Sequence, residues 1–327
     1  KYHGWPTVAR RANGELLLAY SGRHEHVCPF GRLEMMRSKD GGRTWGWPQV
    51  IYDSPIDDRD GGIMETAKGS LLITTFTDYG WEVVLEAAEK VPAEQIDAWA
   101  PAKLAAWRAA RDRVSPPQRR SELGCYMLRS TDGGTTWSAR QRLPLNSPHG
   151  PLQLRDGRLL FPGIARWTRE QKMGVCESRD DGVSWTWLAD IPDRPGDRRF
   201  QTDRRFNYLE LTALECDDGK IICQIRNRDN PNDGETLQTE STDGGQSWNH
   251  PHPIGVWGSP SHLLRLNDER ILMTYGHRRA PFGNQARISA DDGATWSEPM
   301  ILSGDGAGVD LGYPSTVQLG DGSLVTV

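Results

Sequence analysis

Apolar and polar residues alternate along this chain as short paired runs. Each pair has an apolar run, a turn that contains Gly, Asp or Asn, and a second apolar run, as in VARRANGELLLAY near the beginning and TVQLGDGSLVTV near the end. Six such pairs occur along the sequence. Short apolar runs bounded by turn residues are typical of antiparallel β-hairpins. The pattern therefore predicts six β-hairpins distributed over the whole chain.

A second repeat, which we call the Asp box, lies between the hairpins. Its pattern, S-x-D-x-G-x-[ST]-W, occurs at Ser38–Trp45, Ser130–Trp137, Ser178–Trp185, Ser241–Trp248 and Ser289–Trp296. Asp and Gly favour a tight turn, the Asp and Ser or Thr side chains can bond the backbone of that turn, and Trp can pack beneath it. We therefore interpret these aspartates as structural residues and not as catalysts.

Hairpins and Asp boxes together predict the fold. One hairpin followed by one Asp box accounts for four antiparallel strands, which is the composition of a propeller blade. We expect an all-β fold, a six-bladed β-propeller that occupies residues 1–327 as a single domain. The sixth hairpin reaches Val327 with no Asp box after it. The last blade therefore lacks its outer strands in this sequence, and we expect either that residues outside the sequence close the ring or that the closing blade is incomplete.

The second blade is expected to carry an insertion. The interval from Trp45 to Trp137 is nearly twice the interval from Trp137 to Trp185. The excess, at about residues 81–120, is rich in Ala, Glu, Leu and Arg, with apolar residues at helical spacing. We predict a helical insertion, which either packs on the rim of the propeller or covers the mouth of its central channel.

Charge and hydropathy narrow the range of partners. The formal net charge is -5 and the basic residues are dispersed, whereas a nucleic-acid backbone needs a concentrated basic face. No apolar run reaches the ~18 residues that a membrane span needs. We therefore predict neither a nucleic-acid nor a membrane partner. No export signal is visible, and the sequence leaves the compartment open between secreted, periplasmic and cytoplasmic.

The cysteines and histidines do not predict a metal site. The five cysteines are Cys28, Cys125, Cys176, Cys216 and Cys223. They lack the spacing of a zinc site and are expected to be mostly buried free thiols. His3, His24 and His26 also lack tight ligand spacing, so we predict no metal and no other cofactor.

Polar residues gather where the hairpins begin and end. In a propeller these positions converge on one mouth of the central channel. The candidates before the first strand of a hairpin are His3, Arg59, Asp60, His149, Glu210, His262 and Tyr313. The candidates after the second strand are Arg23, Arg166, Arg226, Arg228, Arg278 and Arg279. Guanidinium groups bind carboxylates bidentately, so such a ring suits a small anionic molecule.

Over essentially its whole length the sequence resembles the sialidase (neuraminidase) superfamily. Glu210 in YLELTALECDDG and Arg226 in ICQIRNR match the family's glutamate and second arginine, and Tyr313 in GYPSTVQLGDGSL matches the segment with the nucleophile. Arg278 or Arg279 in GHRRAPFGN resembles the third arginine. The resemblance implies an exo-acting glycoside hydrolase that retains configuration, in which Tyr313 attacks the anomeric carbon and Glu210 accepts its proton. The implied substrate is a glycan with a terminal acidic sugar, sialic acid or a relative, whose carboxylate binds the arginines.

Two positions depart from the family pattern. Gly4, next to His3, stands where the family has its first arginine, and the family's acid/base aspartate falls on Cys28 in SGRHEHVCPFG. Three nearby side chains could replace that aspartate as proton donor, and Asp60 is a further candidate. The nearby ones are His24, Glu25 and His26.

These departures keep two alternatives open. One is a propeller enzyme that hydrolyses a uronic-acid or rhamnose-containing glycan, or cleaves it as a lyase, with histidine as acid or base. The other is a carbohydrate-binding propeller without catalytic activity, because a fold does not fix a function.

Overall fold

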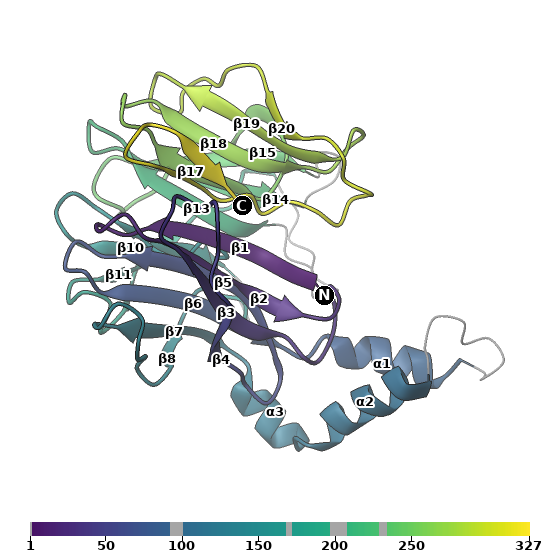
Figure 1. Ribbon diagram of the computed structural model, residues 1–327. Coiled ribbons are helices and arrows are strands. Elements are labelled where there is room, and N and C mark those ends of the chain that lie inside the picture. Colours follow the sequence, from purple (N-terminus) through teal and green to yellow (C-terminus); the bar gives the residue numbers. More distant parts are fainter. Residues whose placement is uncertain (1, 92–100, 168–171, 197–207, 229–233) are drawn as a thin grey trace.

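A computed structural model describes residues 2–91, 101–167, 172–196, 208–228 and 234–327 of the chain (Figure 1). The described strands form five four-stranded antiparallel sheets and one two-stranded sheet. The arrangement is an all-β propeller with five complete blades. Each of the six predicted hairpins is present as a pair of antiparallel strands, so this prediction is confirmed.

The first three blades follow one another along the chain. The first contains β1 (Tyr2–Arg10), β2 (Leu16–Arg23), β3 (Arg32–Ser38) and β4 (Gln49–Tyr52). The second contains β5 (Asp57–Glu65), β6 (Leu71–Asp78), β7 (Cys125–Ser130) and β8 (Gln141–Leu143). The third contains β9 (Leu152–Gln153), β10 (Leu159–Ile164), β11 (Met173–Ser178) and β12 (Thr186–Ile191). In each blade the strands are paired in chain order, from the innermost to the outermost.

The remaining sheets continue this order. The fourth blade contains β13 (Tyr208–Glu215), β14 (Ile221–Asn227), β15 (Glu235–Ser241) and β16 (His252–Trp257). The fifth contains β17 (Ser261–Arg265), β18 (Ile271–His277), β19 (Gly283–Ser289) and β20 (Met300–Ser303). The two-stranded sheet contains β21 (Thr316–Gln318) and β22 (Leu324–Thr326).

The first and last sheets meet, although they come from opposite ends of the sequence. The backbone N–H of Val8 donates to Ser315 Oγ at 3.1 Å. Val8, Val317 and Val325 belong to one apolar cluster. In Figure 1 the C-terminal end lies beside β1. The inner strands therefore close into a ring around the channel.

The core lies between neighbouring blades. Leu17 and Met35 of the first blade pack with Ile63 and Leu71 of the second, and comparable clusters join the later blades. All five cysteines are buried and free, which confirms that prediction. Burying the inward face of every strand between two sheets keeps the strand ends rigid. Those ends carry the polar side chains of the channel mouth.

The Asp boxes have the predicted structural role. In the first, the backbone N–H of Gly42 donates to Ser38 Oγ at 2.8 Å, and that of Thr44 donates to Asp40 Oδ1 at 2.9 Å. The other four boxes repeat both bonds. The hydrogen bonds from Thr44 lower the pKa of Asp40 to about 2. The box carboxylates are thus occupied by their own turns.

Within the described part of the chain, three helices lie between β6 and β7 and extend to one side of the sheets (Figure 1). They are α1 (Trp81–Glu89), α2 (Pro101–Asp112) and α3 (Pro116–Glu122). Trp81 of α1 packs edge-on against Trp107 of α2, and both contact Cys28 in the loop between β2 and β3. The helices therefore support the loop that contains His24 and His26. Within the described residues, no helix has the length and apolar character needed to cross a membrane.

Candidate functional site

Four residues with an unusual backbone conformation occupy corresponding places where different hairpins begin. Trp5, Asp60, Glu210 and Tyr313 have φ angles of 54°, 59°, 53° and 64°. Left-handed backbone at a residue other than glycine costs about 1–3 kcal/mol. In β1, β5 and β13 the residue sits at a β-bulge, where the strand register shifts. A bulge turns a side chain away from the regular alternation of a strand, and all four side chains line one pocket.

This pocket, which we call the mouth pocket, is a cavity of about 390 Å³. Its charged and titratable lining residues are Arg59, Arg166, Arg226, Arg228, Arg278, Asp60, Asp78, Glu210, His26 and Tyr313. Its aromatic walls are Trp5, Phe76 and Trp81. Five arginines face three carboxylates, so the lining has an excess of positive charge. Such a lining favours an anionic ligand.

A hydrogen-bonded cluster of Tyr313, Glu210 and Arg226 lies in the mouth pocket. The hydroxyl of Tyr313 donates to Glu210 Oε1. Arg226 Nη1 donates to Glu210 Oε2 at 2.7 Å and to the hydroxyl oxygen of Tyr313 at 3.3 Å. The structure therefore brings together three residues that the sequence analysis placed at one site.

The electrostatics of this cluster separate the proton donor from the proton acceptor. Burial opposes the ionisation of Glu210, but the charge of Arg226 and the hydrogen bonds from Tyr313 and Arg226 outweigh it and hold the pKa of Glu210 below its usual value. Burial, followed by the charge of Glu210, raises the pKa of Tyr313 well above its usual value. The resting cluster thus has a neutral phenol that donates to an ionised carboxylate.

The other lining arginines are held by neighbouring groups. Arg278 lies 5.8 Å from the ring centre of Tyr313 and donates from Nε to the backbone oxygen of Ser259 at 3.0 Å. Arg166 donates to Asp78 Oδ2 at 3.0 Å. The guanidinium of Arg59 lies over the ring of Trp5, 4.3 Å from its centre. These contacts orient the guanidinium groups before any ligand binds.

Asp60 is a buried carboxyl group in the mouth pocket. Burial, followed by the charge of Glu210, raises its pKa to about 7, although Arg59 and other arginines act in the opposite direction. Close to neutral pH this side chain therefore exchanges a proton with its surroundings. A carboxyl group with this property can donate or accept a proton during a reaction.

The structure places nine of the sequence-predicted site residues in the mouth pocket and seven elsewhere. Those in the pocket are Tyr313, Glu210, His26, Asp60, Arg59, Arg226, Arg228, Arg278 and Arg166. Those that do not line it are His3, His24, Glu25, Arg23, Arg279, His149 and His262.

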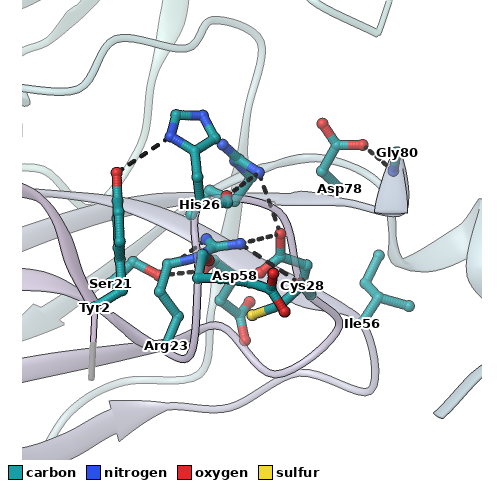
Figure 2. A network of polar contacts seen from close by, with 12 residues as sticks. Tyr2, Ser21, Arg23, His26, Cys28, Ile56, Asp58, Asp78 and Gly80 are labelled. Carbon is teal, nitrogen blue, oxygen red and sulfur yellow. Dashed lines mark hydrogen bonds and ion pairs between the residues drawn. The ribbon is translucent and has the colours of Figure 1, made fainter. Parts of the chain in front are cut away.

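Three of the displaced candidates come from the first strand and the loop after β2. The exposed ring of His3 packs against Tyr20, with 5.0 Å between the ring centres. His24 is exposed and contacts the ring of Phe30. Glu25 forms an ion pair with Lys103 of α2 at 2.8 Å. Of the three loop candidates for a proton donor, only His26 reaches the pocket, where it also lies near Tyr2 (Figure 2).

Arg23 and Arg279 are displaced for different reasons. Arg23 is buried beneath Trp5, where it forms an ion pair with Asp57 at 2.8 Å, so it supports the pocket wall from behind. Arg279 is exposed and lies over the ring of Trp257, 3.9 Å from its centre. Between the two adjacent arginines at the end of β18, the structure selects Arg278 for the pocket.

His149 and His262 line a second cavity of about 330 Å³ together with Glu215 and Arg265. Glu215 ends β13, whereas Glu210 lies near the beginning of the same strand. The two histidines therefore belong to the opposite end of the channel. Their rings lie 5.2 Å apart, and burial lowers the pKa of His149 to about 4 and that of His262 to about 3.

The sequence analysis did not select several residues of the mouth pocket. Asp78 ends β6 at the register position that Arg23 occupies in β2, because each pairs with the third residue before a bulge residue. Its place after a hairpin was therefore a usable signal. Trp5 had no comparable signal, because a tryptophan before a proline does not predict a bulge. Among the described residues, no group of three His, Cys, Asp or Glu could hold a metal ion.

Fold and pocket together define a class of protein, a β-propeller with Asp-box turns and a Tyr–Glu–Arg cluster at the channel mouth. A family model described as "BNR repeat-like domain" matches residues 112–326. The chain belongs to this family and is a divergent, sialidase-like member of the wider sialidase superfamily.

Two curated relatives are named as sialidases. The sialidase of Paraclostridium sordellii is 23% identical, over 78% of this chain and 59% of the relative. The sialidase of Micromonospora viridifaciens is 24% identical, over 97% of this chain and 48% of the relative. The chain therefore spans about half the length of the curated relatives that it matches.

Solved structures share the fold. A protein of unknown function from Dyadobacter fermentans has a TM-score of 0.75 at 24% identity, over 99% of this chain and 89% of the other. The intramolecular trans-sialidase from Ruminococcus gnavus, in complex with oseltamivir carboxylate, has a TM-score of 0.65 at 15% identity, with the same coverage of both chains. At these identities the likeness shows the propeller fold.

Proposed function

We propose that this protein is an exo-acting glycoside hydrolase that removes a terminal acidic sugar, sialic acid or a relative, from a glycan. The observation that carries the proposal is the hydrogen-bonded cluster of Tyr313, Glu210 and Arg226 in a pocket with an excess of arginine. The names of the curated relatives and the carboxylate ligand of the R. gnavus structure agree with it.

In the proposed reaction Tyr313 is the nucleophile. Its oxygen attacks the anomeric carbon while its proton passes to Glu210 Oε1, to which it is already hydrogen-bonded. A neutral phenol approaches an anionic sugar without the repulsion that a carboxylate nucleophile would meet. Arg226 contacts both oxygens and stabilises the negative charge that moves from Glu210 to the phenol oxygen and back.

The sugar carboxylate binds to arginines that line the pocket beside the cluster. Two of these arginines are Arg226 and Arg278, and Arg278 lies over the ring of Tyr313. Because Gly4 replaces the first arginine of the family pattern, we propose that Arg59 is the third arginine that binds the sugar carboxylate. It lines the pocket, and its guanidinium lies over Trp5, the neighbour of Gly4.

Three features of the architecture belong to the same proposal. We infer that β21 and β22 are the inner half of a sixth blade and that the chain folds as one domain. The contact between the last sheet and β1 supports this. We also infer that the helical segment is an insertion into the second blade, where α1 contributes Trp81 and Val84 to the pocket wall.

The test is a comparison of wild type, Tyr313→Phe and Glu210→Gln on aryl glycosides of sialic acid, a uronic acid and rhamnose. We expect turnover of the sialic acid glycoside by the wild type, with the configuration retained, and a loss of about 10²–10⁴-fold in each variant, the range for removal of a proton-transfer group. Arg279→Leu, outside the pocket, is the matched control.

Other outcomes would identify the alternatives. An unsaturated sugar among the products would show elimination and contradict hydrolysis. Turnover of the uronide or rhamnoside alone would replace the substrate class. Binding of free sugar without turnover of any glycoside would leave a carbohydrate-binding propeller.

A further inference from the structure

Hydrolysis at the mouth pocket requires a group that protonates the departing oxygen. Cys28 stands at the family position for this group, but its side chain is fully buried and packs with Trp81 and Trp107. Asp60 is also buried, at the start of β5. An exo-acting enzyme releases the rest of the glycan toward solvent. The donor must therefore lie at the open rim of the pocket.

His26 occupies that rim. It lines the mouth pocket, and its side chain is 45% exposed. The ring of Trp5 packs edge-on against both this residue and the nucleophile: its centre is 5.3 Å from that of His26 and 6.2 Å from that of Tyr313. The imidazole and the phenol therefore contact one indole in one pocket. A sugar ring seated between them would have the nucleophile on one side and the imidazole on the other.

The imidazole of His26 is held by two residues from distant parts of the chain. Its Nδ1 lies 2.7 Å from Asp310 Oδ1. The hydroxyl of Tyr2 donates to the same carboxylate oxygen at 3.1 Å. This hydroxyl also lies 3.1 Å from His26 Nδ1, a contact visible in Figure 2. A carboxylate that accepts from Nδ1–H fixes the orientation of the ring and leaves Nε2 as the nitrogen that exchanges a proton with a ligand.

We propose that His26 is the general acid and base of the reaction at the mouth pocket, and that Asp310 and Tyr2 are positioning residues for it. This inference rests on the proposed glycoside hydrolase function. It assigns a histidine–aspartate pair to the step for which this chain lacks the family's aspartate.

The two chemical steps balance with His26 in this role. In the first, the bond between Tyr313 Oη and the anomeric carbon forms as the glycosidic C–O bond breaks. The departing oxygen keeps the electron pair and takes the proton of His26 Nε2, and the phenol proton moves to Glu210. In the second, neutral His26 takes a proton from water, whose oxygen bonds to the anomeric carbon, while Tyr313 leaves and recovers its proton from Glu210. The net change is the addition of one water.

The charges around His26 predict the direction of the pH dependence. Burial lowers the pKa of His26 below its usual value, and the arginines Arg59 and Arg23 act in the same direction, whereas the carboxylate of Asp310 raises it. Tyr2 has a pKa raised to about 12, chiefly by burial, so it stays neutral. A general acid works only while protonated. Activity should therefore fall as pH rises through the pKa of His26.

The experiment uses two glycosides of the same acidic sugar, one with a 4-nitrophenyl leaving group and one with a sugar leaving group. Nitrophenolate leaves without a proton, whereas a sugar alkoxide needs one. For His26→Gln we expect a loss of about 10²–10⁴-fold in kcat/KM on the sugar glycoside and of less than about 10-fold on the nitrophenyl glycoside. His24→Gln, an exposed histidine two residues away, is the matched control and should leave both values unchanged.

Asp310→Asn gives an independent readout at an exposed position. Because Asp310 raises the pKa of His26, we expect the variant to move the basic limb of the pH profile to lower pH, which a purely structural role would not do. Equal losses on both glycosides in His26→Gln, or an unmoved basic limb in Asp310→Asn, would overturn the assignment while the hydrolase function stands. A wild type without turnover of either glycoside would overturn the hydrolase function and this inference with it.

Discussion

The hydroxyl of Tyr313 donates a hydrogen bond to the carboxylate of Glu210, although 103 residues separate them in the chain. Both residues lie where a hairpin begins, and both have left-handed backbone conformations. Ring closure between the last sheet and β1 is what brings the start of the last hairpin into the channel mouth. The candidate site is therefore a product of the whole propeller and not of a local motif.

Arg226 controls the protonation state of this pair. Burial raises the pKa of Glu210, and the charge of Arg226 is the largest effect that lowers it. In Arg226→Leu burial then dominates, and the pKa of Glu210 rises. The acid limb of the kcat/KM profile should move to higher pH, with a loss of about 10- to 100-fold on its plateau, equivalent to a hydrogen bond to a charged group. Arg226→Lys should keep the limb nearer its original place. An acid limb that is identical in wild type and Arg226→Leu would contradict this role.

The raised pKa of Asp60 predicts that the free energy of unfolding depends on pH. Its folded pKa of about 7 lies above the usual value for Asp, so the folded state binds more protons between the two values. The stability linked to this proton is present at pH 4 and is lost as pH rises through 7. Asp60→Asn should raise the free energy of unfolding at pH 8 by up to about 4 kcal/mol, and change it little at pH 4.

Urea unfolding at the two pH values measures this difference. The exposed Asp53, changed to Asn, is the control and should show the same small effect at both. An equal gain for Asp60→Asn at pH 4 and pH 8 would show that packing, and not ionisation, is responsible.

The sequence predicted the parts of the fold that depend on local signals. A hairpin needs only alternation and turn residues, and an Asp box contains both its turn and its own hydrogen-bond partners, as in Ser38 and Asp40. Glu210 and Tyr313 were found because each begins a hairpin. These features are encoded within about ten residues of sequence.

The site was predicted less well, because it depends on register and on tertiary contacts. His262 is the second residue of β17, and the regular strand carries it to the far end of the channel. Asp60 instead lies at a bulge that turns it into the mouth pocket. The position of His26 depends on Asp310, from a loop at the other end of the chain. No local pattern encodes any of these three outcomes.

The lowered pKa values of His149 and His262 predict that the protein becomes less stable in acid. His149 is buried and His262 is partly buried, with pKa values of about 4 and 3, whereas an unfolded histidine titrates near 6.5. Below that pH the unfolded state binds more protons than the folded state. The free energy of unfolding therefore falls as the pH is lowered from 6.5 toward 4. His149→Gln should remove about 3 kcal/mol of this loss. Unfolding free energies at pH 7 and pH 4.5 test it, with the exposed His24→Gln as control; an unchanged difference between the two pH values would contradict the prediction.

Trp248 and Trp47 form a matched pair for the structural role of the Asp box. Trp248 ends a box, is 9% exposed and donates from Nε1 to the backbone oxygen of Gly245 at 3.1 Å, whereas Trp47 is 93% exposed. Trp248→Ala should lower the free energy of unfolding by about 3–5 kcal/mol, the usual cost of emptying a buried aromatic site. Trp47→Ala should change it by less than about 0.5 kcal/mol.

Neither residue lines the mouth pocket, so kcat/KM of the folded protein should stay at the wild-type value in both. Equal destabilisation by the two substitutions, measured by urea unfolding, would mean that the box tryptophan does not hold neighbouring blades together.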